Sequence, residues 1–137
     1  MLDFKNMFGN LKEDPRQMTP VALAYIGDAV FDLYIRDLLI YKGERLSKNL
    51  HSKAVKYVNA SRQKKYYEKI KEILTEEELL VARRARNRRP TGVPKHSTKE
   101  EYAKATAFEA VIGYIYLCGD MKRLIYILEE SIGDNDD

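Results

Sequence analysis

The chain has 137 residues, of which 45% are hydrophobic and 33% are charged, with a formal net charge of +3. This length suits a single domain with one core, and the composition excludes a disordered chain. Cys118 is the only cysteine, which excludes an internal disulfide and a four-thiolate metal site, and we expect it to be a small buried apolar residue. With no signal-peptide pattern and no ~20-residue apolar run, the sequence predicts a cytoplasmic protein without a membrane span.

Helix-capping signals divide the chain into helices. Thr19 and Pro20 place an N-cap residue before a proline at the first helical position, a combination typical of a helix start. Thr75 and Thr98 are each followed three residues later by a glutamate, which is the capping-box pattern. The expected helices cover about residues 20–41, 47–59, 61–73, 75–88, 98–119 and 121–132.

The predicted architecture is all-α, because the sequence contains no alternating strand pattern of useful length. Residues 1–137 are expected to form a single domain whose core extends from about residue 19 to residue 132. The helices at 20–41 and 98–119 are apolar nearly all round, which places them at the centre of the bundle.

Two acids interrupt these central helices. Asp28 lies in AYIGDAVFDLY, a stretch that otherwise indicates a buried helix, and Glu109 is the only charged residue of ATAFEAVIGYIYLCG. Both acids are flanked by small residues, which would let the helices cross closely with the carboxylates facing each other. Such carboxylates repel unless a proton or a divalent cation lies between them. Alternatively, either acid pairs with Arg36, caps a helix or points into a solvated groove.

A basic segment without any acid lies between Glu78 and Glu100. Arginine side chains bind phosphate oxygens in a bidentate manner, and a cluster of them attracts a polyanion. The helix dipole accounts for one or two cations at a helix C-terminus, and a solvated basic face is the other alternative. The residues expected to bind RNA are Arg83, Arg84, Arg86, Asn87, Arg88, Arg89 and Lys95.

AYIGDAVF resembles the first half of the signature of the ribonuclease III endonuclease domain, and FEAVIGYIYL resembles its second acidic motif. The resemblance covers most of the chain. Within that family, the sequence resembles the Mini-III subfamily. The resemblance rests on the stretches ALAYIGDAVFDLYIR and ATAFEAVIGYIYL, on the short length, and on the expected lack of a double-stranded-RNA-binding domain.

This resemblance implies a helical homodimer that binds double-stranded RNA and cuts it by metal-assisted hydrolysis. Asp28 and Glu109 would then be the catalytic and metal-binding residues, with Mg²⁺ as the cofactor and Mn²⁺ as a substitute. The products would carry 5′-phosphate and 3′-hydroxyl ends. The subfamily also implies precursor 23S ribosomal RNA as the substrate, with a ribosomal protein as a possible partner.

The chain departs from the full family pattern at two positions. Ala24 and Thr106 occupy the places where ribonuclease III usually has two further acids, a reduction that the Mini-III subfamily shares. Thr106, water and an RNA phosphate would then complete the coordination of the metal. Asp32, one turn beyond Asp28, is a candidate to support the site from behind, and an exposed or dimer-contact role is its alternative. The reduced acid set leaves a second hypothesis open, a catalytically silent RNA-binding or ribosome-assembly module on the same fold. A third hypothesis is a helical protein–protein adaptor.

Overall fold

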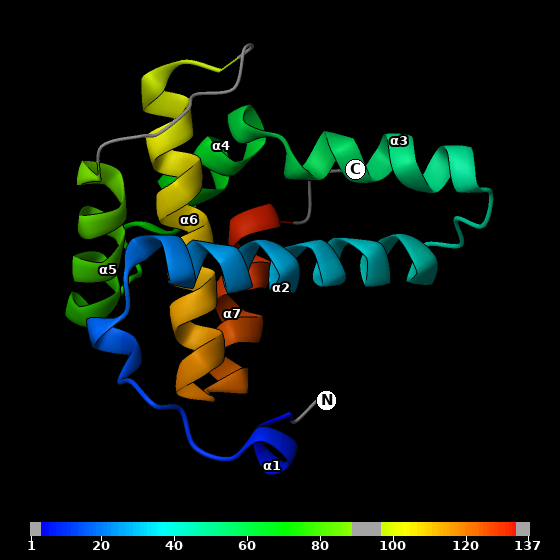
Figure 1. Ribbon diagram of the computed structural model, residues 1–137. Coiled ribbons are helices and arrows are strands. Elements are labelled where there is room, and N and C mark those ends of the chain that lie inside the picture. Colours follow the sequence, from blue (N-terminus) through cyan, green and yellow to red (C-terminus); the bar gives the residue numbers. More distant parts are fainter. Residues whose placement is uncertain (1–3, 89–96, 134–137) are drawn as a thin grey trace.

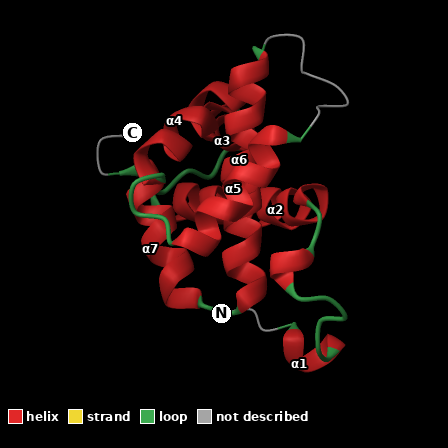
Figure 2. Cartoon of the chain, turned by 90° about the vertical axis from the view of Figure 1, so that its left-hand side faces the viewer, coloured by secondary structure: helices red, strands yellow, loops and turns green. Residues whose placement is uncertain are grey.

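The computed structural model describes residues 4–88 and 97–133, and within these ranges it contains helices joined by loops (Figure 2). The all-α prediction is confirmed. The elements are α1 (Lys5–Phe8), a 3₁₀ turn η1 (Pro15–Gln17), α2 (Pro20–Tyr41), α3 (Ser47–Val58), α4 (Ala60–Ile70), α5 (Glu76–Asn87), α6 (Lys99–Cys118) and α7 (Met121–Ile132).

The predicted capping residues start the helices. Thr19 Oγ1 accepts a hydrogen bond from the backbone of Ala22 at 3.2 Å, and Pro20 occupies the first helical position of α2. Thr75 and Thr98 each form a complete capping box, which fixes the starts of α5 and α6. Neither α1 nor η1 was expected from the sequence, because both are too short to show a hydrophobic period.

Helix α6 is the centre of the bundle and packs against α2, α4, α5 and α7. Figure 1 shows α2 crossing in front of α6 at a steep angle, while α3 runs beside α2 as an arm. The predicted central position is confirmed for α6, but it is wrong for α2, which packs on α6 through one face and leaves its other faces exposed. The core side of α2 is a single stripe, formed by Leu23, Gly27, Phe31, Ile35 and Leu39.

The crossing of α2 and α6 depends on two glycines. A Cβ atom added to Gly27 would lie 1.8 Å from the carbonyl oxygen of Glu109, and one added to Gly113 would lie 1.9 Å from that of Leu23. Real atoms cannot approach so closely, so only glycine allows these backbones to touch. The crossing therefore places Asp28, the neighbour of Gly27, beside Glu109.

Three aromatic rings beneath the crossing join α2, α4 and α6. Phe31 meets Phe108 edge to face, with ring centroids 5.1 Å apart, and Tyr66 packs against both rings at 5.6 Å. All three side chains are buried, and such edge-to-face contacts add to the energy of apolar burial. These rings hold the three helices in a fixed arrangement below the acids.

A buried ion pair ties α5 to α7. The guanidinium of Arg123 donates to both carboxylate oxygens of Glu78, at 2.7 and 3.0 Å, and also to the carbonyl of Ile73 at 2.7 Å. Because Glu78 closes the capping box of α5 as well, one carboxylate fixes both the start of α5 and the position of α7. None of the described helices is long and apolar enough to cross a membrane.

Candidate active site

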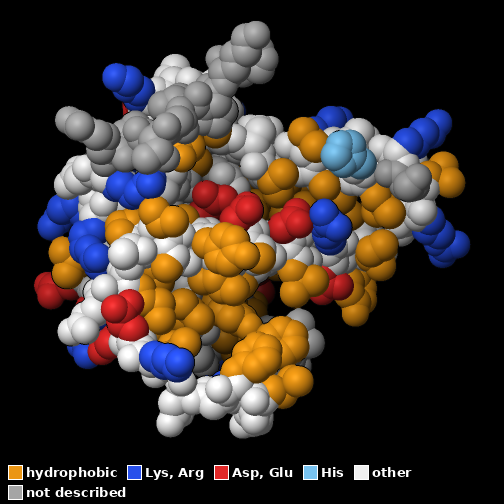
Figure 3. All heavy atoms as spheres, in the orientation of Figure 1, with side chains coloured by type: hydrophobic (Ala, Val, Ile, Leu, Met, Phe, Trp, Pro, Cys, Tyr) orange, Lys and Arg blue, Asp and Glu red, His pale blue; other side chains and the backbone are white. Residues whose placement is uncertain are grey.

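The structure brings Asp28 and Glu109 together, as the small flanking residues predict. The two carboxyl groups lie close enough for Asp28 to raise the pKa of Glu109, and they come from α2 and α6 at the point where the helices touch. Figure 3 shows acidic side chains gathered on this face, over the middle of α2 and close to its crossing with α6. Two carboxylates from distant parts of the chain thus meet in one place.

Burial and the neighbouring acid change the protonation of Glu109. Desolvation is the main cause that raises its pKa to about 9, and the hydrogen bond and charge of Asp28 raise it further. With a pKa of about 9, Glu109 keeps its proton at neutral pH in the absence of a cation. A divalent cation could replace that proton and satisfy both carboxylates.

The expectation that Asp28 is buried is wrong. Its side chain is exposed, whereas Glu109 is half-buried. Helix α2 buries only one stripe of residues, so its other faces carry exposed side chains such as Tyr25 and Leu33 despite their apolar character. The pair therefore has the helix crossing on the side of Glu109 and solvent on the side of Asp28, so that a cation bound there would be accessible from outside.

Asp32 and Thr106, the two residues expected to support the acid pair, have partners of their own. Asp32, one turn after Asp28, forms an ion pair with Arg36 at 3.1 Å. The hydroxyl of Thr106, one turn before Glu109, donates to the carbonyl of Tyr102 at 2.8 Å. Each side chain lies one helical turn from an acid of the pair, and a hydroxyl that donates one bond keeps its acceptor lone pairs. A role for either residue at the metal stays a prediction.

The basic segment forms the exposed side of α5. Arg83, Arg86 and Asn87 are exposed and Arg88 is half-buried, and Figure 3 shows Lys and Arg side chains over this helix, on the left of the view. Arg86 and Arg88 also line a pocket of about 140 Å³ together with Lys99, Tyr102 and Thr106. Because Thr106 lies one turn before Glu109 on α6, this pocket connects the basic segment with the helix that carries the acid.

Two arginines of the segment have internal contacts. Arg84 donates hydrogen bonds to the carbonyls of Arg16 and Met18, both at 3.0 Å, and so fixes the chain that leads into α2. The guanidinium of Arg86 lies 5.9 Å from the centre of the Tyr67 ring. Arg84 therefore stabilises the fold, a role that its position in a basic segment did not indicate. Arg89 and Lys95 lie outside the described residues.

Sequence reasoning missed Gln63, which lies on α4 beside Glu109. Its amide acts against the rise in the pKa of Glu109, and the side chain is only 4% exposed. The sequence did contain one indication of its position. Gln63 precedes Tyr66, Tyr67 and Ile70 at the spacing of a buried helix face, so a polar residue stands among apolar ones on that face.

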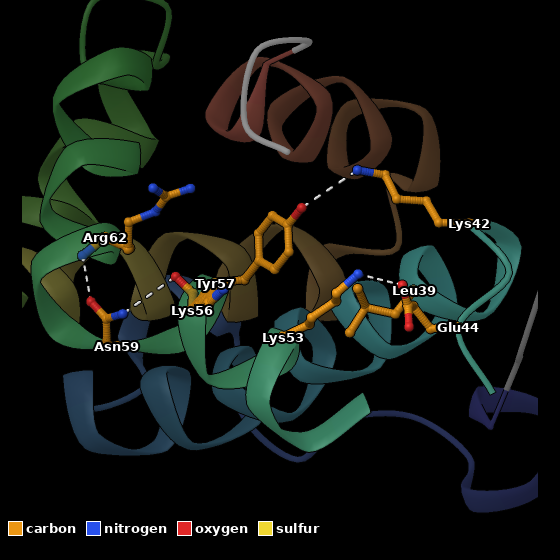
Figure 4. Close-up of a pocket in the computed structure, with 8 residues that line it drawn as sticks. All are labelled: Leu39, Lys42, Glu44, Lys53, Lys56, Tyr57, Asn59 and Arg62. Carbon is orange, nitrogen blue, oxygen red and sulfur yellow. Dashed lines mark hydrogen bonds and ion pairs between the residues drawn. The ribbon is translucent and has the colours of Figure 1, made fainter. Parts of the chain in front are cut away.

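A pocket of about 740 Å³ lies elsewhere, between the end of α2 and the helices α3 and α4. Neither acid of the pair lines it. Figure 4 shows how its polar side chains contact one another: Lys42 donates to the hydroxyl of Tyr57 and Lys53 pairs with Glu44. The size of a pocket therefore does not locate the candidate site, which is an open surface over the α2–α6 crossing.

Cys118 is exposed, so the prediction that it is buried is wrong. It ends α6 beside the left-handed Gly119, where the helix leaves the core. Among residues 4–88 and 97–133, no group of three or more His, Cys, Asp or Glu side chains could hold a metal ion. Within the described part of the chain, Asp28 and Glu109 are therefore the two acids available to a cation at this place.

Comparisons with known proteins give one consistent relationship. The ribonuclease III domain model matches residues 21–120. The Mini-ribonuclease 3 of Thermoanaerobacter sp. (strain X514) is 41% identical over 121 residues, which cover 88% of this chain and 85% of that protein. That of Clostridium tetani is 40% identical over 119 residues, covering 86% and 79%. The crystal structure of a Fusobacterium nucleatum protein, 33% identical, superposes with a TM-score of 0.77 over 86% of this chain and 94% of that one.

Proposed function

The chain belongs to the ribonuclease III family, and on that premise we propose that this endoribonuclease uses Mg²⁺ to cut double-stranded, structured RNA. The observation that carries the proposal is the Asp28–Glu109 pair. Two carboxyl groups from α2 and α6 meet on an open surface at the helix crossing, next to the exposed basic side of α5. This arrangement offers a cation site and a phosphate-binding surface side by side.

The donor set of the pair fits Mg²⁺. This ion prefers oxygen ligands and keeps several of its waters, so that one or two protein carboxylates and substrate phosphates complete its coordination. The exposure of Asp28 leaves room for water and for a phosphate above the pair. Mn²⁺ prefers similar ligands and would substitute.

The residues of the chain would share the work of hydrolysis. Asp28 and Glu109 hold the cation, and the half-buried position of Glu109 fixes it relative to the α2–α6 crossing. When bound, Mg²⁺ supplies a Lewis acid that activates water and offsets the charge that develops on the scissile phosphate. Arg83, Arg86 and Arg88 bind neighbouring phosphates and so orient the backbone. Cleavage would leave 5′-phosphate and 3′-hydroxyl ends.

We propose a homodimer as the working unit. Exposed apolar side chains on α2 repeat at helical spacing beside the acid, namely Val21, Tyr25 and Leu33, and Tyr25 is 81% exposed. A second copy that covered this face would remove apolar surface from water and place two acid pairs near each other. Each protomer would then cut one strand of the duplex.

The finer substrate assignment follows the resemblance to the Mini-III subfamily. We propose that the enzyme acts in the cytoplasm on precursor 23S ribosomal RNA, with a ribosomal protein as a possible partner. Because A-form duplexes are recognised mainly through shape and 2′-hydroxyl groups, the geometry of the RNA helix would determine where the enzyme cuts.

Removal of the metal tests the catalytic proposal. We expect a duplex RNA to be cut in Mg²⁺ and to remain intact in EDTA, with 5′-phosphate ends on the products. The alternative is a catalytically inactive RNA-binding or ribosome-assembly module, and the small number of acids at the site is the observation in its support. It predicts that the duplex is bound but not cut in either condition, so a gel of products alongside a binding measurement separates the two functions.

Cation binding should depend on pH because the cation displaces the proton of Glu109. Its pKa of about 9 means that each pH unit below 9 strengthens proton competition, so affinity for Mn²⁺ should rise about tenfold per unit towards pH 9 and then level off. Isothermal titration between pH 6.5 and 8.5 would measure this. In Glu109→Gln the pH dependence should disappear; an equally steep dependence in that variant would contradict the assignment.

The exposed arginines should contribute to RNA affinity through phosphates. Arg83→Ala combined with Arg86→Ala should weaken binding of different duplexes to a similar extent and make the plot of log affinity against log salt less steep by about 1 to 2. Filter binding in EDTA at several salt concentrations would measure this. Arg84→Ala is the matched control, because its loss should lower thermal stability and leave the salt slope unchanged. An unaltered slope in the double variant would exclude these two residues from the RNA surface.

A further inference from the structure

Gln63 reaches the acid pair from a third helix. It lies on α4 one turn before Tyr66, whose ring packs against both Phe31 of α2 and Phe108 of α6. Since residues three apart share a helix face, the contact of Tyr66 places Gln63 against the same crossing that holds the acids. The influence of its amide on Glu109 agrees with this position.

The amide of Gln63 is buried and incompletely bonded. The side chain is 4% exposed. Among the described residues, its Nε2 is the one buried side-chain nitrogen or oxygen atom that has no hydrogen-bond partner. Buried polar groups in folded proteins are nearly always bonded, so an exception calls for an explanation. The acceptor within reach is the carboxyl group of Glu109, whose pKa the amide of Gln63 lowers, yet no hydrogen bond of normal length and angle joins the two side chains.

We propose that Gln63 is a positioning residue of the active site: its Nε2 donates a hydrogen bond that holds the carboxylate of Glu109 in the orientation that binds the cation. This inference rests on the proposed function. A carboxylate that binds a cation through one oxygen leaves its other oxygen free to accept such a bond. The buried donor is thus placed for the ionised carboxylate, which is the form that binds a cation and which accepts a hydrogen bond more strongly than the protonated form.

Partners behind a metal ligand fix its orientation, and their loss commonly lowers metal affinity or activity by about 10- to 100-fold. A merely structural glutamine would behave differently. Replacing a buried amide that lacks a partner by an apolar side chain of similar size removes an unmet donor, and such a change is neutral or stabilising for the fold. Gln63→Leu therefore separates the two roles, because stability and cation affinity should change independently.

The experiment compares the full-length wild type with Gln63→Leu. In EDTA, the melting temperature of the variant should equal or exceed that of the wild type. Its affinity for Mn²⁺, measured by titration calorimetry without RNA, should fall about tenfold or more. On duplex RNA kcat should fall while KM remains close to the wild-type value, because RNA phosphates do not contact Gln63. An Mn²⁺ affinity within twofold of the wild type would overturn the proposal.

Two further variants complete the test. Gln63→Met keeps the unbranched shape without a donor, so it carries the same measurement if Gln63→Leu does not fold. Ser131→Ala is the control, because Ser131 is a buried polar residue of α7 whose hydroxyl bonds to Leu128, and its loss should leave Mn²⁺ affinity unchanged. A wild type that neither binds Mn²⁺ nor cuts RNA refutes the proposed function. If the wild type binds Mn²⁺ and cuts RNA, and Gln63→Leu has the same Mn²⁺ affinity and the same kcat, only the positioning role of Gln63 is refuted.

Discussion

Asp28→Asn should lower the rate of duplex cleavage by about 10³-fold or more while leaving the fold intact. Asparagine keeps the size and shape of the side chain but cannot carry the negative charge that a cation requires. Removing one oriented charge from a catalytic centre commonly costs a factor of 10² to 10³, and loss of the cation itself removes the activation of water as well. Because Asp28 is exposed, the melting temperature should change little.

Single-turnover cleavage at saturating Mg²⁺ would measure this loss. Asp37→Asn is the matched control, since it makes the same change at another exposed position of α2 and should cleave normally. Glu109→Gln should be as inactive as Asp28→Asn, and the double variant should be scarcely slower than either single variant, because residues that act as a unit are not additive. A rate for Asp28→Asn within tenfold of the wild type would disprove the metal-binding assignment.

Gly27→Ala should destabilise the fold by about 3–5 kcal/mol, as should Gly113→Ala. Helix propensity alone would make alanine more stable than glycine by about 1 kcal/mol. The expected loss of folding stability therefore comes entirely from packing. Each new methyl group would overlap a backbone carbonyl of the opposite helix, and no flexible side chain can move to relieve the overlap. Helices α2 and α6 would have to separate, which also moves Asp28 away from Glu109.

Urea unfolding would measure the stability, and Mn²⁺ titration would report the separation of the acids. Gly119→Ala is the control on the same helix: its φ of 81° makes alanine strained, but a Cβ there meets no atom within 4 Å. That variant should lose about 1–2 kcal/mol and keep its Mn²⁺ affinity. If Gly27→Ala were as stable as the wild type, the close crossing of the two helices would be wrong.

The helices could be predicted because their signals are local. Thr19, Thr75 and Thr98 cap their own helices through residues three positions away, and the structure confirms all three starts. The crossing was also predictable, since Gly27 precedes Asp28 directly and Gly113 lies one turn after Glu109, both in largely apolar stretches. Small residues at such positions have few uses except to let two backbones approach.

The candidate site was predicted less completely, because the state of a side chain depends on its neighbours in space. Asp28 and Glu109 look alike in sequence, yet one is exposed and the other half-buried with a raised pKa. Arg83 and Arg84 are adjacent in a basic run, yet only Arg84 bonds to the carbonyls before α2. Gln63 is separated from Glu109 by 46 positions, so nothing local indicated its role.

The sequence by itself determined where the helices begin, which two of them cross and which two acids the crossing unites. Those features follow from capping bonds, hydrophobic period and the missing side chains of glycine, all of which act over a few residues. The tertiary structure alone decided how deeply each acid is buried, which arginines remain available for a phosphate and which amide reaches Glu109. Burial, pKa and hydrogen-bond partners arise from contacts between distant parts of the chain, and these exist only after the helices have packed.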